Sequence, residues 1–253
     1  MKDWIEQKKQ GLVYRARNLR YGILFMFSKW YKIPSKLWIR GRYRSFRFHY
    51  HQAAAFNYEF REICLEDCYS LKDIKKRIPV STIIDIGANQ GLFLLAARKN
   101  FPHATIQGYE PNPLLIPFLA HNSKSLNAQI FIEAVSDQNG KMQLQFGESD
   151  LLTTAIKSEA GTVLGVSFNK VIERAGGQID LLKLDCEGGE WPLLQMTELW
   201  KCVRAITMEY HLWAKPEMTI EKLVNELTSM GFEIIKISQL SESFGMLTAV
   251  KAK

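Results

Sequence analysis

Four residues that follow an apolar run have the types and the spacing of a nucleotide-binding turn: Asp85, Gly87, Asn89 and Gly91. The apolar run begins at residue 82, and the residues from 92 onward read as the start of a helix. A strand, a glycine turn and a helix in this order place backbone N–H groups and a helix N-terminus against a nucleotide-like ligand. Gly87 would permit the tight turn, and Gly91 would allow a close approach of backbone and ligand.

An acidic residue stands at the distance that such a turn requires. Glu110 lies 19 positions after Gly91, at the end of the next apolar run, residues 104–109. A carboxylate at this place can accept hydrogen bonds from both hydroxyls of a ribose. The alternative is an ordinary strand–helix turn, which the acidic residue at this distance disfavours.

Strands and helices must alternate if these residues are to meet, and from residue 81 onward the pattern predicts that they do. The expected strands lie near residues 82–86, 104–109, 129–135, 179–184, 203–209, 232–238 and 246–251. The expected helices lie near residues 90–100, 113–124, 167–175, 189–199 and 218–230. Such alternation predicts an α/β fold with a seven-stranded, mostly parallel sheet and helices on both faces. The last two strands are close in sequence, so we expect one of them to be antiparallel.

Polar and mostly acidic residues follow each of the first five expected strands. Beyond the glycine turn and Glu110, they are Asn112, Ser136, Asp137, Asp185, Glu187, Glu190, Glu209, Tyr210 and His211. Ligands of open parallel sheets bind outside the carboxyl ends of the strands, so these side chains should converge. Carboxylates suit the sulfonium, the amino group and the ribose of S-adenosylmethionine, whereas they would repel the pyrophosphate of a dinucleotide. The pattern therefore favours a methyltransferase over a nicotinamide-dependent dehydrogenase.

Four motifs together resemble the FkbM family of methyltransferases: D-I-G-A-N-x-G, E-P-N, A-V-S-D-x-x-G and D-L-L-K-L-D-x-E-G-x-E. The resemblance covers about residues 60–240, and its most specific part is residues 183–190. It implies a class I methyltransferase Rossmann-like fold, S-adenosylmethionine as methyl donor, and O-methylation of a hydroxyl. Family acceptors include sugar hydroxyls of glycans and glycolipids and hydroxyls of polyketide-like natural products. Around residues 148–156 this chain departs from the serine-rich stretch that is common in the family.

The resemblance also implies roles for individual residues. Those that would hold the methionine part of the cofactor are Asp85, Gly87, Asn89 and Gly91. Glu110 would bind the ribose, with Asn112 beside it in the E-P-N motif. Val135 and Ser136 would lie near the adenine, and Asp185 near the sulfonium or the acceptor.

The general base is open among three residues. His211 follows the fifth expected strand, and its ordinary pKa near 6.5 suits proton removal from a hydroxyl. A histidine at this place can equally be structural, and Asp185 and Glu187 are alternatives. Glu187 can instead cap the following helix. Oxygen donors for a metal are present, but no spacing compels a metal site and none is predicted.

The first fifty residues differ in charge from the rest of the chain. They hold 13 Lys and Arg against two acids, which is a net charge of +11, whereas the remainder carries −4. We expect residues 1–79 to form a basic N-terminal extension, with a helix over 1–33, a hairpin within 37–50 and a helix over 53–77, and residues 80–253 to form the cofactor-binding domain. The basic helix can dock on its own domain, on a second subunit as a homo-oligomer, or on a membrane surface. It contains no recognisable nucleic-acid-binding module, so no nucleic-acid partner is expected.

Composition places the protein among ordinary globular proteins, with 47% apolar and 23% charged residues. No apolar run approaches the roughly 20 residues that span a membrane, and no signal-peptide pattern is present. The four cysteines are scattered, which fits reduced thiols. The expected location is cytoplasmic, with peripheral contact at the inner membrane face as an extension.

The sequence thus predicts a S-adenosylmethionine-dependent O-methyltransferase that acts on a hydroxyl, with a sugar of a glycan or glycolipid as the favoured acceptor. One alternative is O-methylation of a polyketide-like or other small natural product. Another is a protein of the same fold that binds the cofactor or a partner without turnover.

Overall fold

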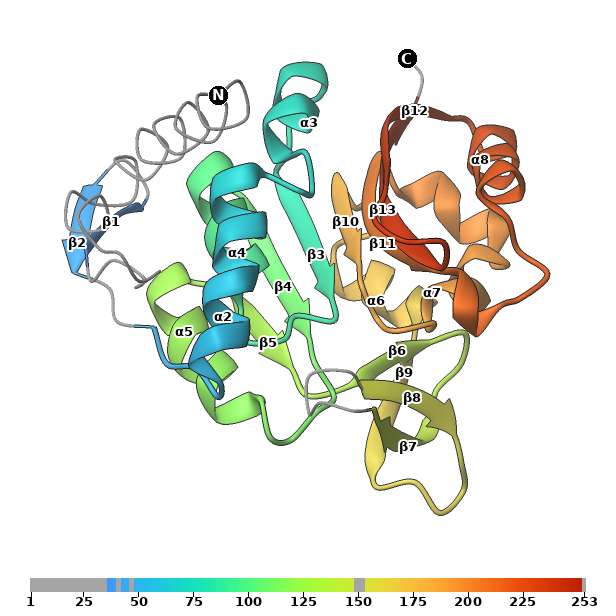
Figure 1. Cartoon of the computed structure of the whole chain (residues 1–253), viewed down its shortest axis with the longest axis horizontal. Coiled ribbons are helices and arrows are strands. Elements are labelled where there is room, and N and C mark those ends of the chain that lie inside the picture. Colours follow the sequence, from blue (N-terminus) through green and yellow to red (C-terminus); the bar gives the residue numbers. More distant parts are fainter. Residues whose placement is uncertain (1–35, 40–41, 46–47, 148–152, 252–253) are drawn as a thin grey trace, which may run out of the picture.

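The computed structural model describes residues 36–39, 42–45, 48–147 and 153–251 (Figure 1). The predicted basic helix over residues 1–33 lies outside these ranges. Within the described residues, the first strands are β1 (Lys36–Ile39) and β2 (Arg42–Ser45), which pair antiparallel as the predicted hairpin. None of the described helices combines the length and the apolar character needed to cross a membrane.

The centre of the fold is a seven-stranded sheet in the order β12-β13-β11-β10-β3-β4-β5. Its strands are β3 (Thr82–Ile86), β4 (Thr105–Tyr109), β5 (Gln129–Phe131), β10 (Leu181–Leu184), β11 (Ala205–His211), β12 (Phe232–Gln239) and β13 (Phe244–Lys251). Only β13 runs against the others, because it pairs antiparallel with both β11 and β12. The prediction of a mostly parallel sheet with one antiparallel strand at its end is confirmed.

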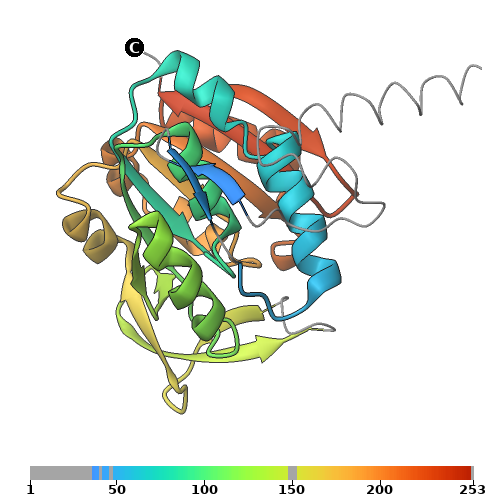
Figure 2. The same ribbon diagram turned by 90° about the vertical axis from the view of Figure 1, so that its left-hand side faces the viewer.

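Helices cover both faces of this sheet, as predicted (Figures 1 and 2). One face carries α2 (Ala53–Phe60), α3 (Leu71–Arg77), α4 (Leu92–Asn100) and α5 (Ile116–Leu126). The other carries α6 (Phe168–Arg174), α7 (Glu190–Leu194) and α8 (Ile220–Ser229). Neighbouring strand residues alternate between the two cores, so that Ile83 packs on the first face and Ile84 on the second. A strand that is buried on both faces reads as one continuous apolar run.

The predicted strand over residues 129–135 is wrong in extent, because the chain leaves the central sheet after Phe131. The following β6 (Ala134–Ser136) belongs to a second sheet of order β6-β9-β7-β8, with β7 (Gly140–Phe146), β8 (Thr153–Lys157) and β9 (Val163–Ser167). Between the two sheets Glu133 forms an ion pair with Arg174 of α6. Apolar residues lie on both sides of Glu133, so the pattern predicts one strand across this point.

Two predicted helices are interrupted. Residues 53–77 form α2, a π-helix η2 (Arg61–Glu66) and α3, because Asp67 and Ser70 adopt left-handed backbone angles, with φ of 60° and 53°. Residues 189–199 form the short α7, followed by the 3-10 helix η3 (Thr197–Cys202). There the buried Trp200 donates its indole N–H to the Leu193 carbonyl at 2.9 Å, which occupies an acceptor that a longer helix would use.

Candidate active site

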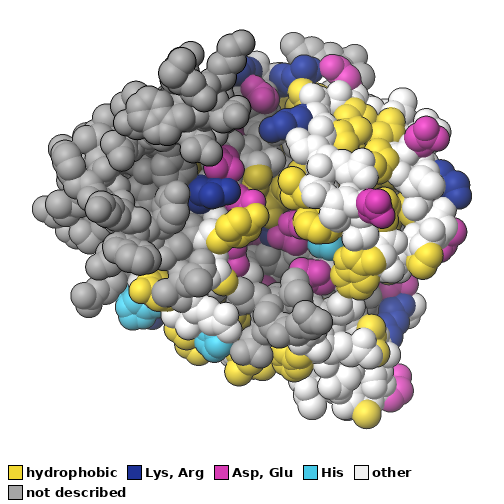
Figure 3. Space-filling view, in the orientation of Figure 1, with side chains coloured by type: hydrophobic (Ala, Val, Ile, Leu, Met, Phe, Trp, Pro, Cys, Tyr) yellow, Lys and Arg dark blue, Asp and Glu magenta, His cyan; other side chains and the backbone are white. Residues whose placement is uncertain are grey.

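The carboxyl ends of four adjacent strands, β4, β3, β10 and β11, meet at one edge of the central sheet. The loops that follow the first three of them, together with β6 and β8, line a solvent-open cleft with about 710 Å³ of empty space. A concave site with a few convergent polar groups at the strand ends of an α/β sheet is where small-molecule ligands bind. Figure 3 shows acidic side chains and a histidine gathered in a hollow between the two halves of the molecule.

The glycine turn brings β3 into contact with the end of β10. Gly87 has a φ of +80°, and a Cβ on it would lie 1.8 Å from the carbonyl oxygen of Asp185. The close approach that requires a glycine is therefore one between two backbone segments. Gly91 also has a positive φ, of +91°, where α4 begins, but a Cβ there would meet the Leu119 side chain at 3.2 Å. Its expected approach to a ligand is thus replaced by packing between α4 and α5.

Glu110 lines the cleft at the end of β4. Its carboxylate is buried and accepts hydrogen bonds from the backbone N–H groups of Asn89 and Asn112, both at 2.8 Å. Burial raises the pKa of Glu110 to about 7, and the two N–H donors and Lys183 partly oppose this rise. Each oxygen keeps a further lone pair, so the carboxylate can still accept from a ligand hydroxyl.

The cleft also contains an unsatisfied acceptor. The side-chain oxygen of Asn89 is buried and makes no hydrogen bond with any described residue, and Asn89 lines the cleft. On the far wall, Val135 of β6 presents an apolar surface, whereas Ser136 donates to Asp137 at 2.8 Å instead. The free side-chain oxygen of Asn89 fits the amino group of S-adenosylmethionine. The carboxylate of Glu110 fits its ribose, and the apolar wall at Val135 fits its adenine.

A buried lysine joins the two strands behind the cleft. Lys183 on β10 is paired in register with Asp85 on β3, and its ammonium lies 3.1 Å from that carboxylate. The same ammonium lies 3.5 Å from Asp185, which also accepts a hydrogen bond from the Tyr69 hydroxyl at 2.8 Å. Burial alone would lower the pKa of Lys183, but the two aspartates raise it above its ordinary value. Burial raises the pKa of Asp85 to about 6, against the opposing charge of Lys183.

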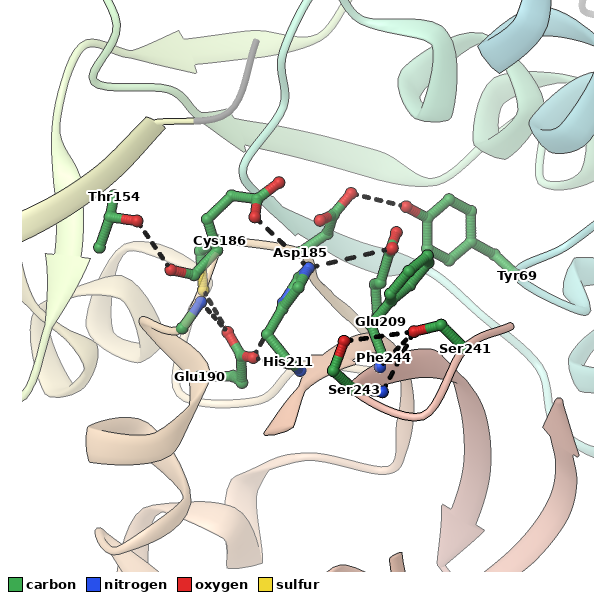
Figure 4. Close-up of polar contacts among 12 residues, drawn as sticks. Tyr69, Thr154, Asp185, Cys186, Glu190, Glu209, His211, Ser241, Ser243 and Phe244 are labelled. Atoms are coloured by element: carbon green, nitrogen blue, oxygen red, sulfur yellow. Dashed lines mark hydrogen bonds and ion pairs between the residues drawn. The ribbon is translucent and has the colours of Figure 1, made fainter. Parts of the chain in front are cut away.

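A histidine and four carboxylates converge beyond the end of β10 (Figure 4). His211 is buried, and its Nδ1 lies 3.0 Å from the carboxylate of Glu190, which has no exposed surface. Because a carboxylate oxygen accepts, Nδ1 is the ring nitrogen that donates to Glu190, and Nε2 is turned toward the other acids. Nε2 lies 3.6 Å from Glu187 and 3.9 Å from Glu209. Asp185, Glu209 and His211 each offer one metal-ligand atom, and these three atoms lie within 4.8 Å of one another. The three residues could therefore also hold a divalent cation.

The pKa values of this cluster are shifted because several ionisable groups lie close together where they are poorly solvated. Burial and the neighbouring Asp185 raise the pKa of Glu209 to about 8. Burial also raises the pKa of Glu187 to about 7, although His211 opposes the rise. Burial alone would lower the pKa of His211, but the hydrogen bond to Glu190 and the surrounding acids raise it to about 9. Groups with such shifted pKa values are candidates for proton transfer.

A second pocket adjoins the cleft and shares Glu187 with it. It has about 1020 Å³ of empty space, open to solvent, and its polar side chains include Glu187, Glu209 and His211. The other side is aromatic, with Trp213 from the short 3-10 helix η4 (Leu212–Ala214) and Phe244 from β13. The two pockets could hold a donor and an acceptor on either side of one loop.

The predicted site residues divide into three groups. Those that line the cleft are Gly87, Asn89, Glu110, Val135, Asp185 and Glu187. Those that support it without lining it are Asp85, Gly91, Asn112 and Ser136. His211 lines the second pocket. Sequence reasoning missed Tyr69, Lys183 and Trp213. Only Lys183 had a detectable signal, since it lies inside the most specific motif on a strand expected beside that of Asp85.

The sheet order, the single antiparallel β13, the turn after β3 and the carboxylate after β4 define a class I methyltransferase Rossmann-like fold. Residues 85–234 match the family model described as the methyltransferase FkbM domain. The chain is 25% identical over 233 residues to methyltransferase sdnD of Sordaria araneosa, covering 75% of this chain and 88% of that protein. It is 24% identical over 217 residues to 31-O-demethyl-FK506 methyltransferase FkbM of Streptomyces tacrolimicus, covering 70% and 81%.

A similar solved structure is magnesium protoporphyrin IX methyltransferase (ChlM) of Synechocystis PCC 6803 with bound SAM. It has a TM-score of 0.47 and 10% identity, with 81% of this chain and 87% of that chain covered. From the match to the family model, the chain belongs to the FkbM family of S-adenosylmethionine-dependent methyltransferases.

Proposed function

We propose that this methyltransferase transfers the methyl group to a hydroxyl on a sugar of a glycan or glycolipid. The observation that carries the proposal is the junction of the two pockets at Glu187, next to a histidine that is oriented by a buried carboxylate. S-adenosylmethionine supplies an electrophilic methyl group on its sulfonium. The chain must then bind the donor, align the acceptor oxygen and remove its proton.

Donor binding falls to the residues around the glycine turn. Glu110 would accept hydrogen bonds from the ribose hydroxyls, and the unsatisfied oxygen of Asn89 would accept from an amino group. Val135 would cover the adenine. Asp85 would act indirectly, because it holds Lys183 and thereby fixes the end of β10 beside the turn.

Proton removal falls to His211, with Glu190 as its positioning residue. Glu190 holds Nδ1 and also accepts from the backbone N–H of His211 at 2.9 Å, so Nε2 faces Glu187 and Glu209. The pKa of His211 is raised by the surrounding acids, and a cation bound in the cleft would lower it again by offsetting them. The imidazole would then accept the hydroxyl proton, while Asp185 and Glu187 orient the acceptor.

Oxygen as the acceptor atom gains support from the relative named 31-O-demethyl-FK506 methyltransferase. The same name favours a second candidate acceptor, a hydroxyl of a polyketide-like natural product. A sugar is preferred because several carboxylates and exposed aromatic side chains line one pocket.

Calorimetric titration with S-adenosylmethionine and S-adenosylhomocysteine tests the donor site. We expect binding by the wild type, weakened about 10- to 100-fold in Glu110→Gln, because a buried acceptor loses its charge. The pKa of Glu110 is raised to about 7, so this acid is protonated below that pH and the affinity of the wild type should fall there. The exposed Glu159→Gln is the matched control. Absence of binding to both ligands by folded protein would refute the proposal.

A further inference from the structure

Two half-exposed aromatic side chains border the second pocket. Trp213 of η4 is 49% exposed and Phe146 of β7 is 50% exposed, and both line the pocket together with Phe244. Large apolar side chains left open at the rim of a pocket commonly mark a binding site. Because they come from three separate segments, their meeting is a property of the tertiary structure.

The segment that carries Trp213 is held firmly in place. The backbone N–H of Leu212 donates to the Ser243 carbonyl at 2.7 Å, which ties η4 to the β12–β13 hairpin. On its other side η4 packs against Gly188, where an added Cβ would lie 2.5 Å from the Ala214 side chain. The Trp213 ring stands edge-on to the His211 ring, with centroids 5.7 Å apart. A wall fixed in this way binds a ligand without the entropic cost of ordering it.

The polar side of the pocket offers acceptors that have no donor. Neither the Glu187 nor the Glu209 carboxylate accepts a hydrogen bond within 3.5 Å from a described residue, and their nearest cationic contact is Nε2 of His211. Thr154 of β8 donates to the backbone carbonyl of Glu187 at 3.1 Å, which fixes the loop but leaves its carboxylate free (Figure 4). A ligand with several hydroxyl donors would satisfy both acids.

We propose that the pocket binds the acceptor as a pyranose ring, with its C–H face stacked on Trp213 and its hydroxyls donating to Glu209 and Glu187. This inference rests on the proposed function. A pyranose combines one apolar face with a rim of hydroxyl donors, which matches the pocket's aromatic wall and its unsatisfied carboxylates. A flat phenolic ring would cover the aromatic wall but would exclude solvent from these partly buried carboxylates without giving both of them a donor, which is costly.

This placement also selects the hydroxyl that reacts. The ring hydroxyl nearest Glu187 lies at the junction with the cleft and closest to Nε2 of His211. Its O–H bond breaks and its proton passes to Nε2, while the oxygen forms the new bond to the methyl carbon. The carbon–sulfur bond electrons of the sulfonium return to sulfur, which leaves a neutral thioether.

Saturation-transfer NMR with methyl α-D-mannopyranoside, methyl β-D-galactopyranoside and methyl α-L-rhamnopyranoside tests the stacking. We expect at least one glycoside to bind wild-type protein, Trp213→Ala to weaken that binding about tenfold, and Trp213→Phe to keep most of it, since a ring remains. Glu209→Gln should also weaken binding. Leu164→Ala is the control, because Leu164 is 64% exposed on β9 and is not among the residues that line the pocket.

Three outcomes would overturn the inference: no glycoside binds, Trp213→Ala binds as the wild type does, or p-cresol binds more tightly than every glycoside and is unaffected by Glu209→Gln. The spectra are recorded with and without S-adenosylhomocysteine. Failure of the donor site would appear in the titration described above, so it is distinguishable from failure of the acceptor pocket.

Discussion

The cleft and the second pocket both contain carboxylates that are withdrawn from solvent, Glu110 fully and Glu187 and Glu209 in part, but the hydrogen bonding of these carboxylates differs. In the cleft, Glu110 accepts two backbone hydrogen bonds at 2.8 Å. In the second pocket, Glu187 and Glu209 accept none from the described residues and face a single histidine. Burial raises the pKa of all three acids.

This contrast separates a pre-organised site from one that a ligand must complete. Glu110 is held in one orientation by backbone that the glycine turn positions, which suits a ligand of constant shape. Glu187 and Glu209 lie in an electrostatically unfavourable environment as long as no hydrogen-bond donor contacts them. We therefore expect hydroxyl groups of the methyl acceptor to donate hydrogen bonds to both. Three measurements test this difference between the two regions.

The largest effect is expected in the cleft, at the contact between the glycine turn after β3 and the end of β10. In Gly87→Ala the new Cβ would lie 1.8 Å from the Asp185 carbonyl oxygen, so β3 and β10 must move apart. We expect the free energy of unfolding to fall by about 3–5 kcal/mol, measured by urea denaturation, and donor binding to be lost. Gly176→Ala is the control, since its φ of +83° is equally strained but nothing lies within 4 Å. It should cost only about 1–2 kcal/mol. Equal costs for the two variants would show that the contact is unimportant.

The next largest effect is on the rate of catalysis, with the affinity for the methyl donor unchanged. His211→Gln should lower kcat about 10²- to 10⁴-fold, because the general base is removed. Glu190→Gln should lower kcat less and shift the acidic, ascending limb of the pH–rate profile to lower pH, since the carboxylate that raises the pKa of His211 loses its charge. Calorimetry should give an unchanged affinity for S-adenosylhomocysteine in both variants. A parallel loss of donor affinity would mean that the two pockets are not independent.

The smallest effect is on stability as a function of pH. The folded-state pKa values of Glu110, Glu187 and Glu209 are raised to about 7, 7 and 8, and that of His211 to about 9. All four groups therefore bind protons in the folded state at pH values where the unfolded chain has released them. Stability should fall as pH rises from about 5 to 9, with a Tm lower by several degrees at pH 9 than at pH 6.

Variants assign this pH dependence to one region or the other. Calorimetric scans of the ligand-free protein should show a smaller slope in Glu209→Gln and in Glu110→Gln. A larger reduction in Glu209→Gln would place most of the electrostatic strain in the acceptor pocket, as the contrast requires. A Tm that rises with pH over this range would contradict the assigned shifts.

The cleft and its glycine turn follow from patterns that the sequence records. The turn after β3 and Glu110 after β4 depend on short-range order, in which an apolar run, glycines and an acid follow one another within thirty residues. The alternation of elements then sets a parallel sheet, and parallel strands bring their carboxyl ends to one edge. The topology and the residues around the donor therefore follow from local patterns.

The second pocket, by contrast, depends on contacts between distant segments. Trp213, Phe146 and Phe244 come from a 3-10 helix and two different sheets, and no spacing links them. The break between β5 and β6 is equally invisible, because apolar residues lie on both sides of it. The pairing of Lys183 with Asp85 and the hold of Glu190 on His211 depend on strand register and loop position. Contacts between distant segments arise from packing, and a one-dimensional pattern records only which faces are buried.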